Sequence, residues 1–88
     1  MYLVKVNAMW CPSCLIMNNH YEKIANKYNL ELKSLDYDLD ENVVKELHVG
    51  NILPVLIIYK NDEEVLRIVG EQSYQQLEKK IGELLWNL

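Results

Sequence analysis

Two cysteines, Cys11 and Cys14, are the only thiols in the chain, and Pro12 and Ser13 separate them. They stand where a β-rich segment gives way to a helical pattern. At the N-terminus of a helix, free backbone N–H groups and the positive end of the helix dipole stabilise a thiolate. We therefore expect Cys11 to be an exposed, activated N-cap residue and Cys14 to be sheltered one turn below. Such a pair is suited to thiol–disulfide exchange, in which Cys11 attacks a disulfide and Cys14 resolves the mixed disulfide.

Two other uses of the pair fit the sequence less well. As a structural cross-link, a Cys11–Cys14 bridge closes a very small loop and contributes only about 2 kcal/mol. A closed zinc site needs four ligands, and the only histidines are His20 and His48. His20 lies about 240° around the helix from Cys14, so we expect it on the solvated surface, and we expect His48 near the end of a short helix. We expect no metal and no bound cofactor, only a redox-active Cys11–Cys14 disulfide.

Composition narrows the class of protein. The 88 residues carry a net charge of −4 and 50% hydrophobic residues, which predicts one domain, residues 1–88. Without a Lys/Arg-rich run, we expect no nucleic-acid partner. The longest apolar run, residues 53–59, is too short to span a membrane, and residues 1–8 lack the pattern of a signal peptide. We expect a cytoplasmic protein.

Hydrophobic periodicity predicts four strands, at residues 2–8, 30–37, 54–59 and 64–69, with residues 60–63 forming a tight turn in a hairpin. The segment after the cysteines has a helical stripe of apolar residues, which are Cys14, Met17, Tyr21, Ile24, Ala25 and Tyr28.

Two further helices are expected. For a short one, Asp40-Glu41-Asn42 offers the N-cap, and the helix continues to about Leu47 and is ended by Gly50. The last begins with a capping box of Ser73 and Gln76, and its apolar stripe consists of Leu77, Ile81, Leu84, Leu85 and Leu88. We expect the six tyrosines and Trp86 to be core or half-buried.

The order of the elements is β-α-β-α-β-β-α. It predicts an α/β fold with a mixed four-stranded sheet and helices on both faces. The first two strands are expected to be parallel, because a helix connects them.

Several segments resemble the thioredoxin superfamily. They are Trp10-Cys11-Pro12-Ser13-Cys14, residues 50–63 and Val69-Gly70. The chain is more similar to thioredoxin than to glutaredoxin, since residues 52–54 and 69–73 do not match the glutathione-binding segments of glutaredoxins. The extra N-terminal strand and helix of thioredoxin are missing, which leaves a thioredoxin-like fold of glutaredoxin size.

The resemblance implies a substrate-binding surface around the reactive sulfur. It implies that the Leu53–Pro54 bond is cis and that Pro54 faces the cysteines, with the backbone of Leu53 free to pair with an extended substrate. It assigns further substrate contacts to Trp10, Pro12, Ser13 and Gly70. From the residues alone, Gly70 is equally well an ordinary loop glycine.

The resemblance also points to a departure from the family. Thioredoxins have a buried acid behind the second cysteine and a lysine on the neighbouring strand. Here Lys5 and Asp36 take these places, so we expect a pair with exchanged charges that tunes the pKa of Cys14. The alternative is that Lys5 extends its amine to water.

The resemblance implies a function. We expect a monomeric protein-disulfide reductase whose partners are disulfide-containing proteins and a flavoprotein thioredoxin reductase that uses NADPH. Two alternatives stay open. One is a glutaredoxin-like, glutathione-coupled reductase, and the other is a redox-responsive binding module without turnover.

Overall fold

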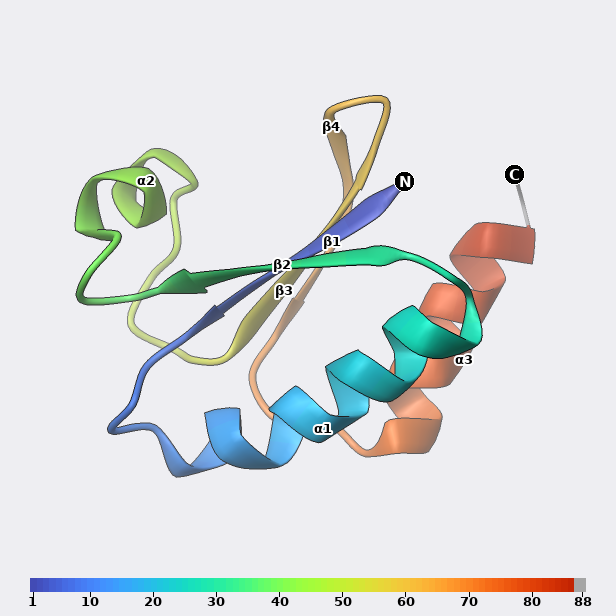
Figure 1. Ribbon diagram of the computed structural model, residues 1–88, viewed down its shortest axis with the longest axis horizontal. Helices are drawn as coiled ribbons and strands as arrows, with labels where there is room; N and C mark the ends of the chain where they lie inside the picture. The colour runs from blue at the N-terminus through green and yellow to red at the C-terminus, as the bar shows by residue number, and fades with distance from the viewer. Residues whose placement is uncertain (87–88) are drawn as a thin grey trace.

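A four-stranded sheet forms the centre of the computed structural model, which describes residues 1–86 (Figure 1). The strands are β1 (Tyr2–Asn7), β2 (Glu31–Asp36), β3 (Val55–Lys60) and β4 (Glu63–Val69), and their order in the sheet is β2-β1-β3-β4. Strand β1 is parallel to β2 and antiparallel to β3, while β3 and β4 form an antiparallel hairpin. The predicted mixed sheet is confirmed.

Three helices cover the two faces of this sheet. Helices α1 (Pro12–Lys27) and α3 (Tyr74–Trp86) pack on one face, and the short α2 (Glu41–Glu46) packs on the other. The predicted element order β-α-β-α-β-β-α is confirmed. Within residues 1–86, no helix has the length and apolar character that a membrane span needs.

Alternation along β1 decides which side chains face which helices. Leu3 joins the core under α1 and α3, whereas Val4 and Val6 join the core under α2. Because successive side chains of a strand point to opposite faces, Lys5 lies on the α1 side. The residues Val55 to Ile58 of β3 are all buried, as expected for a strand covered on both faces.

The starts of α1 and α3 follow local sequence signals. Pro12 occupies the first turn of α1, where its missing N–H leaves no hydrogen bond unmade. At α3, the amide of Gln76 donates to Ser73 Oγ at 3.2 Å, and the amide of Ser73 donates to Gln76 Oε1 at 3.1 Å. The predicted capping box is confirmed. So is the hairpin turn, where Asn61 and Asp62 both have positive φ.

The ends of α2 differ from the prediction. Asp40 is the N-cap, but its carboxylate accepts from the amide of Asp36 instead of capping the helix. The helix is ended by His48, with φ +57°, and not by Gly50. The amide of His48 donates to the Lys45 carbonyl, and the His48 carbonyl accepts from Arg67. These contacts fix a left-handed residue before the glycine is reached.

Two side chains are placed differently from expectation. Trp86 is exposed at the end of α3, because the residues of that helix that face the core are Leu77 and Ile81. His20 is half-buried instead of solvated, since its ring packs 5.7 Å from that of Tyr74. The six tyrosines are buried or half-buried as predicted. Leu88 lies outside the described residues.

Candidate active site

Cys11 occupies the N-cap of α1. Its backbone is extended, with φ −101° and ψ 107°, and its Sγ accepts from the amide of Cys14 at 3.3 Å. A second bond, from the Cys11 amide to the Ala8 carbonyl, ties the end of the β1–α1 loop. Backbone N–H groups at a helix start are aimed at the cap residue, and the bond from the Cys14 amide shows that this sulfur occupies that position. Both cysteines are free thiols here.

The cysteine pair is more enclosed than predicted. Cys11 is 6% exposed and Cys14 is 1% exposed, so the expectation of an openly exposed Cys11 is wrong, although Cys14 is the more sheltered of the two. The enclosure comes from distant segments, since Tyr37 and Leu53 pack against the cluster of Ala8 and the two cysteines. Both sulfurs are therefore buried in this structure, with Cys11 slightly nearer to the surface.

The surroundings of Cys14 keep it protonated. Burial raises the pKa of Cys14 to about 11, and its hydrogen bond and charge interaction with Cys11 act in the same direction. A backbone hydrogen bond with Ala8 lowers the pKa of Cys14 in part. A buried thiol loses solvation when it ionises. Cys14 is thus suited to remain a protonated thiol until a substrate is bound covalently to Cys11.

The loop before β3 lies against the cysteine pair. The Leu53–Pro54 bond is cis, as the resemblance implied, and Leu53 packs against the cysteine cluster. None of the backbone bonds of the described loops and turns involves Leu53. Gly70, with φ +85°, donates its amide to the Pro54 carbonyl at 2.7 Å. Its positive φ accounts for a glycine in this loop, and its substrate role stays a prediction.

Trp10 is held beside Cys11 by two residues that the sequence analysis missed. Its indole N–H donates to Asp38 Oδ2 at 2.8 Å, and its ring meets that of Tyr37 edge-on, with centroids 6.1 Å apart. Trp10 is nevertheless 61% exposed. The acidic run Asp38-Leu39-Asp40, shortly after β2, is the feature of the sequence that could have suggested an acceptor for the indole N–H. A fixed and exposed aromatic surface next to the thiol suits contact with a substrate.

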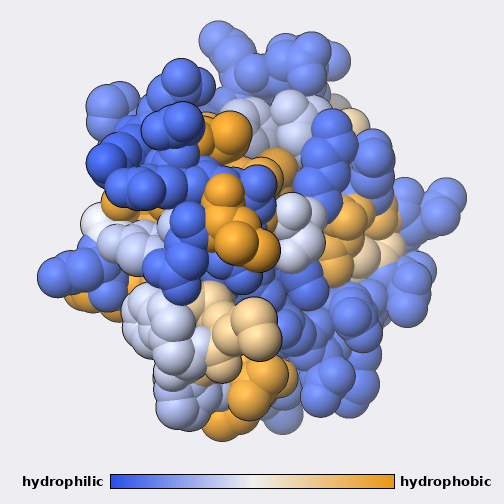
Figure 2. All heavy atoms as spheres, turned by 60° about the vertical axis from the view of Figure 1, so that its left-hand side comes forward, coloured by the Kyte–Doolittle hydropathy of each residue, from blue (hydrophilic) through white to orange (hydrophobic). Residues whose placement is uncertain are grey.

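Apolar side chains reach the surface around this site. Figure 2 brings forward the end of the molecule that carries α2 and the β1–α1 loop, and hydrophobic patches appear there among hydrophilic ones. Met9 and Ile52 are exposed with Trp10, and Ile52 lies near Gly70. Pro12 is exposed and Ser13 is half-buried on the first turn of α1.

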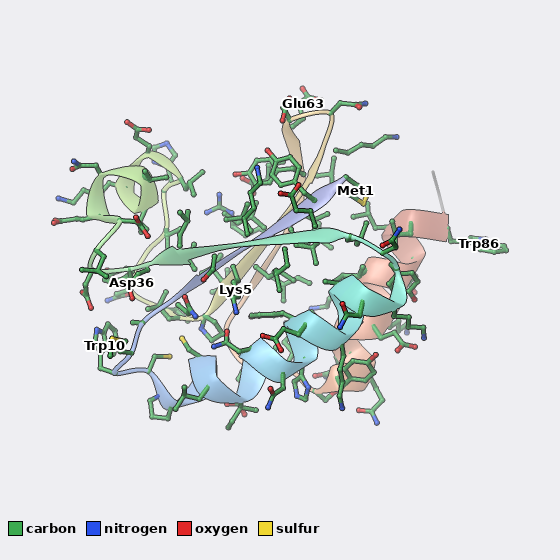
Figure 3. The ribbon with its side chains drawn as sticks, viewed as in Figure 1. Met1, Lys5, Trp10, Asp36, Glu63 and Trp86 are labelled. Atoms are coloured by element: carbon green, nitrogen blue, oxygen red, sulfur yellow. The ribbon has the colours of Figure 1, made fainter. Side chains whose placement is uncertain are left out.

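Lys5 and Asp36 do not form the expected pair. In Figure 3 the Lys5 side chain leaves β1 toward α1, and Asp36 lies apart from it near the end of β2. The ion pairs of residues 1–86 do not include them. Asp36 Oδ1 instead accepts from the amides of Asp38 and Leu39. Lys5, at 9% exposure, is buried and is not among the groups that shift the pKa of Cys14. Its tuning role stays a prediction.

Comparison with known proteins decides the family. The family model for Thioredoxin matches residues 1–83. This chain belongs to the thioredoxin family. It is 31% identical over 83 residues to Thioredoxin H2 of Arabidopsis thaliana, covering 93% of this chain and 61% of that one. It is 33% identical to thioredoxin of Staphylococcus saprophyticus, covering 90% and 77% of the two chains. This thioredoxin therefore spans about three fifths to three quarters of the length of these two relatives.

Solved structures agree on the fold of this thioredoxin. Thioredoxin 1 from Thermosipho africanus superposes with a TM-score of 0.87, at 19% identity, and covers 97% of this chain and 94% of the other. Reduced thioredoxin pre-protein from Schistosoma mansoni gives a TM-score of 0.82 at 26% identity, with 93% and 76% coverage. With its dithiol at a helix N-terminus, the protein is a thiol–disulfide oxidoreductase. In the described part of the chain, no group of three or more potential ligands could hold a metal ion.

Proposed function

We propose that this thioredoxin reduces disulfides in protein substrates, with Cys11 as the attacking thiol and Cys14 as the resolving thiol. The placement of the two sulfurs carries the proposal. At the helix N-cap, Cys11 Sγ accepts a hydrogen bond from the Cys14 amide, and the Cys14 side chain is the more deeply buried of the two. Cys11 attacks one substrate sulfur and the other leaves as a thiolate. Cys14 then attacks Cys11, the mixed disulfide breaks, and the second substrate sulfur is released. The substrate gains two electrons and two protons.

The surface around the cysteines favours protein substrates. Exposed Met9, Trp10 and Ile52 offer apolar contact beside the entrance to Cys11. The free backbone of Leu53 suits an extended chain, which pairs by adding a strand-like hydrogen bond. Contacts from Pro12, Ser13, Pro54 and Gly70 belong to the same proposed surface, which would bind substrate without a cofactor.

Electrons would come from a flavoprotein thioredoxin reductase that uses NADPH. Support comes from one relative, the Bifunctional thioredoxin reductase/thioredoxin of Mycobacterium leprae, which is 30% identical over 88 residues. It covers 98% of this chain and 19% of that protein. Its name joins the two activities in one polypeptide. We also propose that this chain acts as a monomer in the cytoplasm, where thiols are kept reduced.

Coupled turnover tests this function. Insulin reduction is followed with NADPH and a bacterial thioredoxin reductase, and in parallel with glutathione, glutathione reductase and NADPH. We expect turnover with the first system, and no turnover in Cys11→Ser. Turnover only with glutathione would favour the glutaredoxin-like alternative. Binding of a partner that depends on the disulfide state, without turnover in either system, would favour the binding module.

A further inference from the structure

A buried tyrosine hydroxyl on the same helix face as Cys14 makes no hydrogen bond within the described fold. Tyr21 belongs to the core-facing stripe of α1 and is 0% exposed. Its hydroxyl has no hydrogen-bond partner among the described residues. A buried polar group without a partner destabilises a protein, because it has lost its bonds with water. Such a group calls for an explanation, and a role in catalysis is one of them.

The geometry of α1 directs this hydroxyl toward Cys14. Tyr21 follows Cys14 by seven positions, which is close to two full turns of the helix. Both side chains are therefore on one face of α1, with their Cα atoms about 10 Å apart along the axis. Side chains of a helix lean toward its N-terminus, and the long tyrosine side chain closes much of that distance. Burial raises the pKa of Tyr21 most, and charges on Cys14 and Cys11 raise it further. In the dithiol form the hydroxyl makes no hydrogen bond with either sulfur.

The groups packed around Tyr21 are apolar. Leu56 and Ile58 of β3, Ile68 of β4, and Leu77 and Ile81 of α3 share its core cluster. From β1, Leu3 belongs to the same cluster, and Lys5, the one buried charged residue of the described chain, follows it on the same face of the sheet without belonging to the cluster. The Tyr21 hydroxyl is therefore the polar side-chain group among the buried residues of this cluster.

We propose that the Tyr21 hydroxyl stabilises the Cys14 thiolate in the resolving step by donating a hydrogen bond to it. This inference rests on the proposed role of Cys14. In the dithiol form the Cys14 sulfur belongs to a thiol, and a thiol sulfur accepts a hydrogen bond only weakly. Once Cys14 is ionised, its sulfur becomes a strong acceptor for a neutral O–H donor.

In the resolving step, Cys14 gives its proton to solvent, and the electron pair of its sulfur forms the Cys11–Cys14 bond. The bond between Cys11 and the substrate sulfur breaks, and that sulfur leaves with the electron pair and takes up a proton. The two cysteines are oxidised and the substrate disulfide is reduced. Tyr21 keeps its proton throughout, because burial raises its pKa.

The variant Tyr21→Phe removes the hydroxyl and keeps the ring. The mixed disulfide of Cys11 with thionitrobenzoate is prepared at pH 4, and after a jump to higher pH the attack of Cys14 releases coloured thionitrobenzoate. We expect release at pH 7 to slow about three- to tenfold and its pH midpoint to rise, while attack of Cys11 on the reagent is unchanged. The midpoint of urea unfolding should stay equal or increase, since an unpartnered buried hydroxyl has been removed.

A control variant completes the test. Tyr59→Phe is the matched control, because this half-buried tyrosine stacks on Tyr2 on the other face of the sheet. It should release thionitrobenzoate at the parent rate. An unchanged rate and pH midpoint in Tyr21→Phe would overturn the proposal, and so would a lower unfolding midpoint, which marks a structural hydroxyl. If the parent itself releases no thionitrobenzoate from Cys11, the proposed role of Cys14 fails instead.

Discussion

The indole N–H of Trp10 donates to the carboxylate of Asp38 at 2.8 Å. This bond joins the β1–α1 loop to the segment that follows β2, and it fixes the ring that flanks Cys11. The edge-on contact with Tyr37 supports the same ring from the neighbouring position. The proposed substrate surface at Trp10 is therefore supported by two segments that are 28 residues apart.

The variant Asp38→Ala tests the role of this bond. We expect the reduction of insulin to slow by about two- to fivefold, because the freed Trp10 ring must be ordered on binding. Reaction with a small disulfide should change little. The bond is exposed, so the free energy of unfolding should fall by at most about 1 kcal/mol. Fluorescence anisotropy of Trp10, measured in a Trp86→Phe background, should decrease.

A matched control is Asp62→Ala. Asp62 also accepts a bond from an exposed aromatic residue, Tyr2, at the hairpin turn of β3 and β4. Equal loss of insulin reduction in both variants would show that the effect is unspecific.

The raised pKa of Cys14 predicts a pH dependence of stability. The unfolded chain ionises this thiol near its ordinary pKa of 9, whereas the folded chain holds its pKa at about 11. The folded state therefore binds the proton more tightly. The stabilisation that protonated Cys14 contributes is fully present below pH 9 and is lost as the pH rises through about 11. We expect the free energy of unfolding of the reduced protein, measured in urea, to fall by about 1–3 kcal/mol over this range.

The control for this prediction is Cys14→Ser, which retains Cys11 and all six tyrosines. Its stability should fall less over the same pH range, and the difference between the two proteins isolates Cys14. Parallel pH profiles would contradict the assignment of the raised pKa to this thiol.

The capping box of α3 predicts a loss of stability without a loss of chemistry. In Ser73→Ala the Gln76 amide loses its acceptor, and the unfolding free energy should fall by about 1 kcal/mol. Insulin reduction at 25 °C should be unchanged, because neither Ser73 nor Gln76 belongs to the cluster around the cysteines. Gln75→Ala, at an exposed position of the same turn, serves as control. A cost as large in that control would rule out the capping explanation.

The left-handed residue after α2 predicts that opposite substitutions, His48→Gly and Gly50→Ala, both stabilise the protein. His48 has φ +57°, so His48→Gly relieves its backbone and should stabilise the protein by up to about 1 kcal/mol. Gly50 has no positive φ, and a Cβ placed there meets no atom within 4 Å. Gly50→Ala should therefore stabilise by about 0.4–1 kcal/mol, by restricting the unfolded chain. Destabilisation by Gly50→Ala would restore Gly50 as the residue that ends α2.

Features decided by neighbours in sequence were predictable. The N-cap position of Cys11, Pro12 in the first turn and the Ser73–Gln76 box each depend on residues within one turn, and the structure has all three. The stripes of α1 and α3 followed from helical periodicity. The continuous apolar run of β3 identified a strand that is buried on both faces.

Features decided by distant contacts were not predictable in the same way. Cys11 is enclosed because Tyr37 and Leu53 reach it from two other segments. Trp10 depends on Asp38, and His48 is held through Arg67 of β4. Asp36 is occupied by amides of its own turn, which no alignment of charges along the strands reveals. Periodicity assigns a residue to a face, but it does not identify which side chain arrives from elsewhere.

Trapping of a mixed disulfide tests the central claim most directly. The Cys14→Ser variant is incubated with insulin whose disulfides are intact, and the products are analysed by mass spectrometry without reductant. The account predicts a stable covalent adduct through Cys11, and no adduct in Cys11→Ser, whose remaining thiol is buried. An adduct that forms through Cys14 in Cys11→Ser as readily as through Cys11 in Cys14→Ser would contradict the assignment of the two roles.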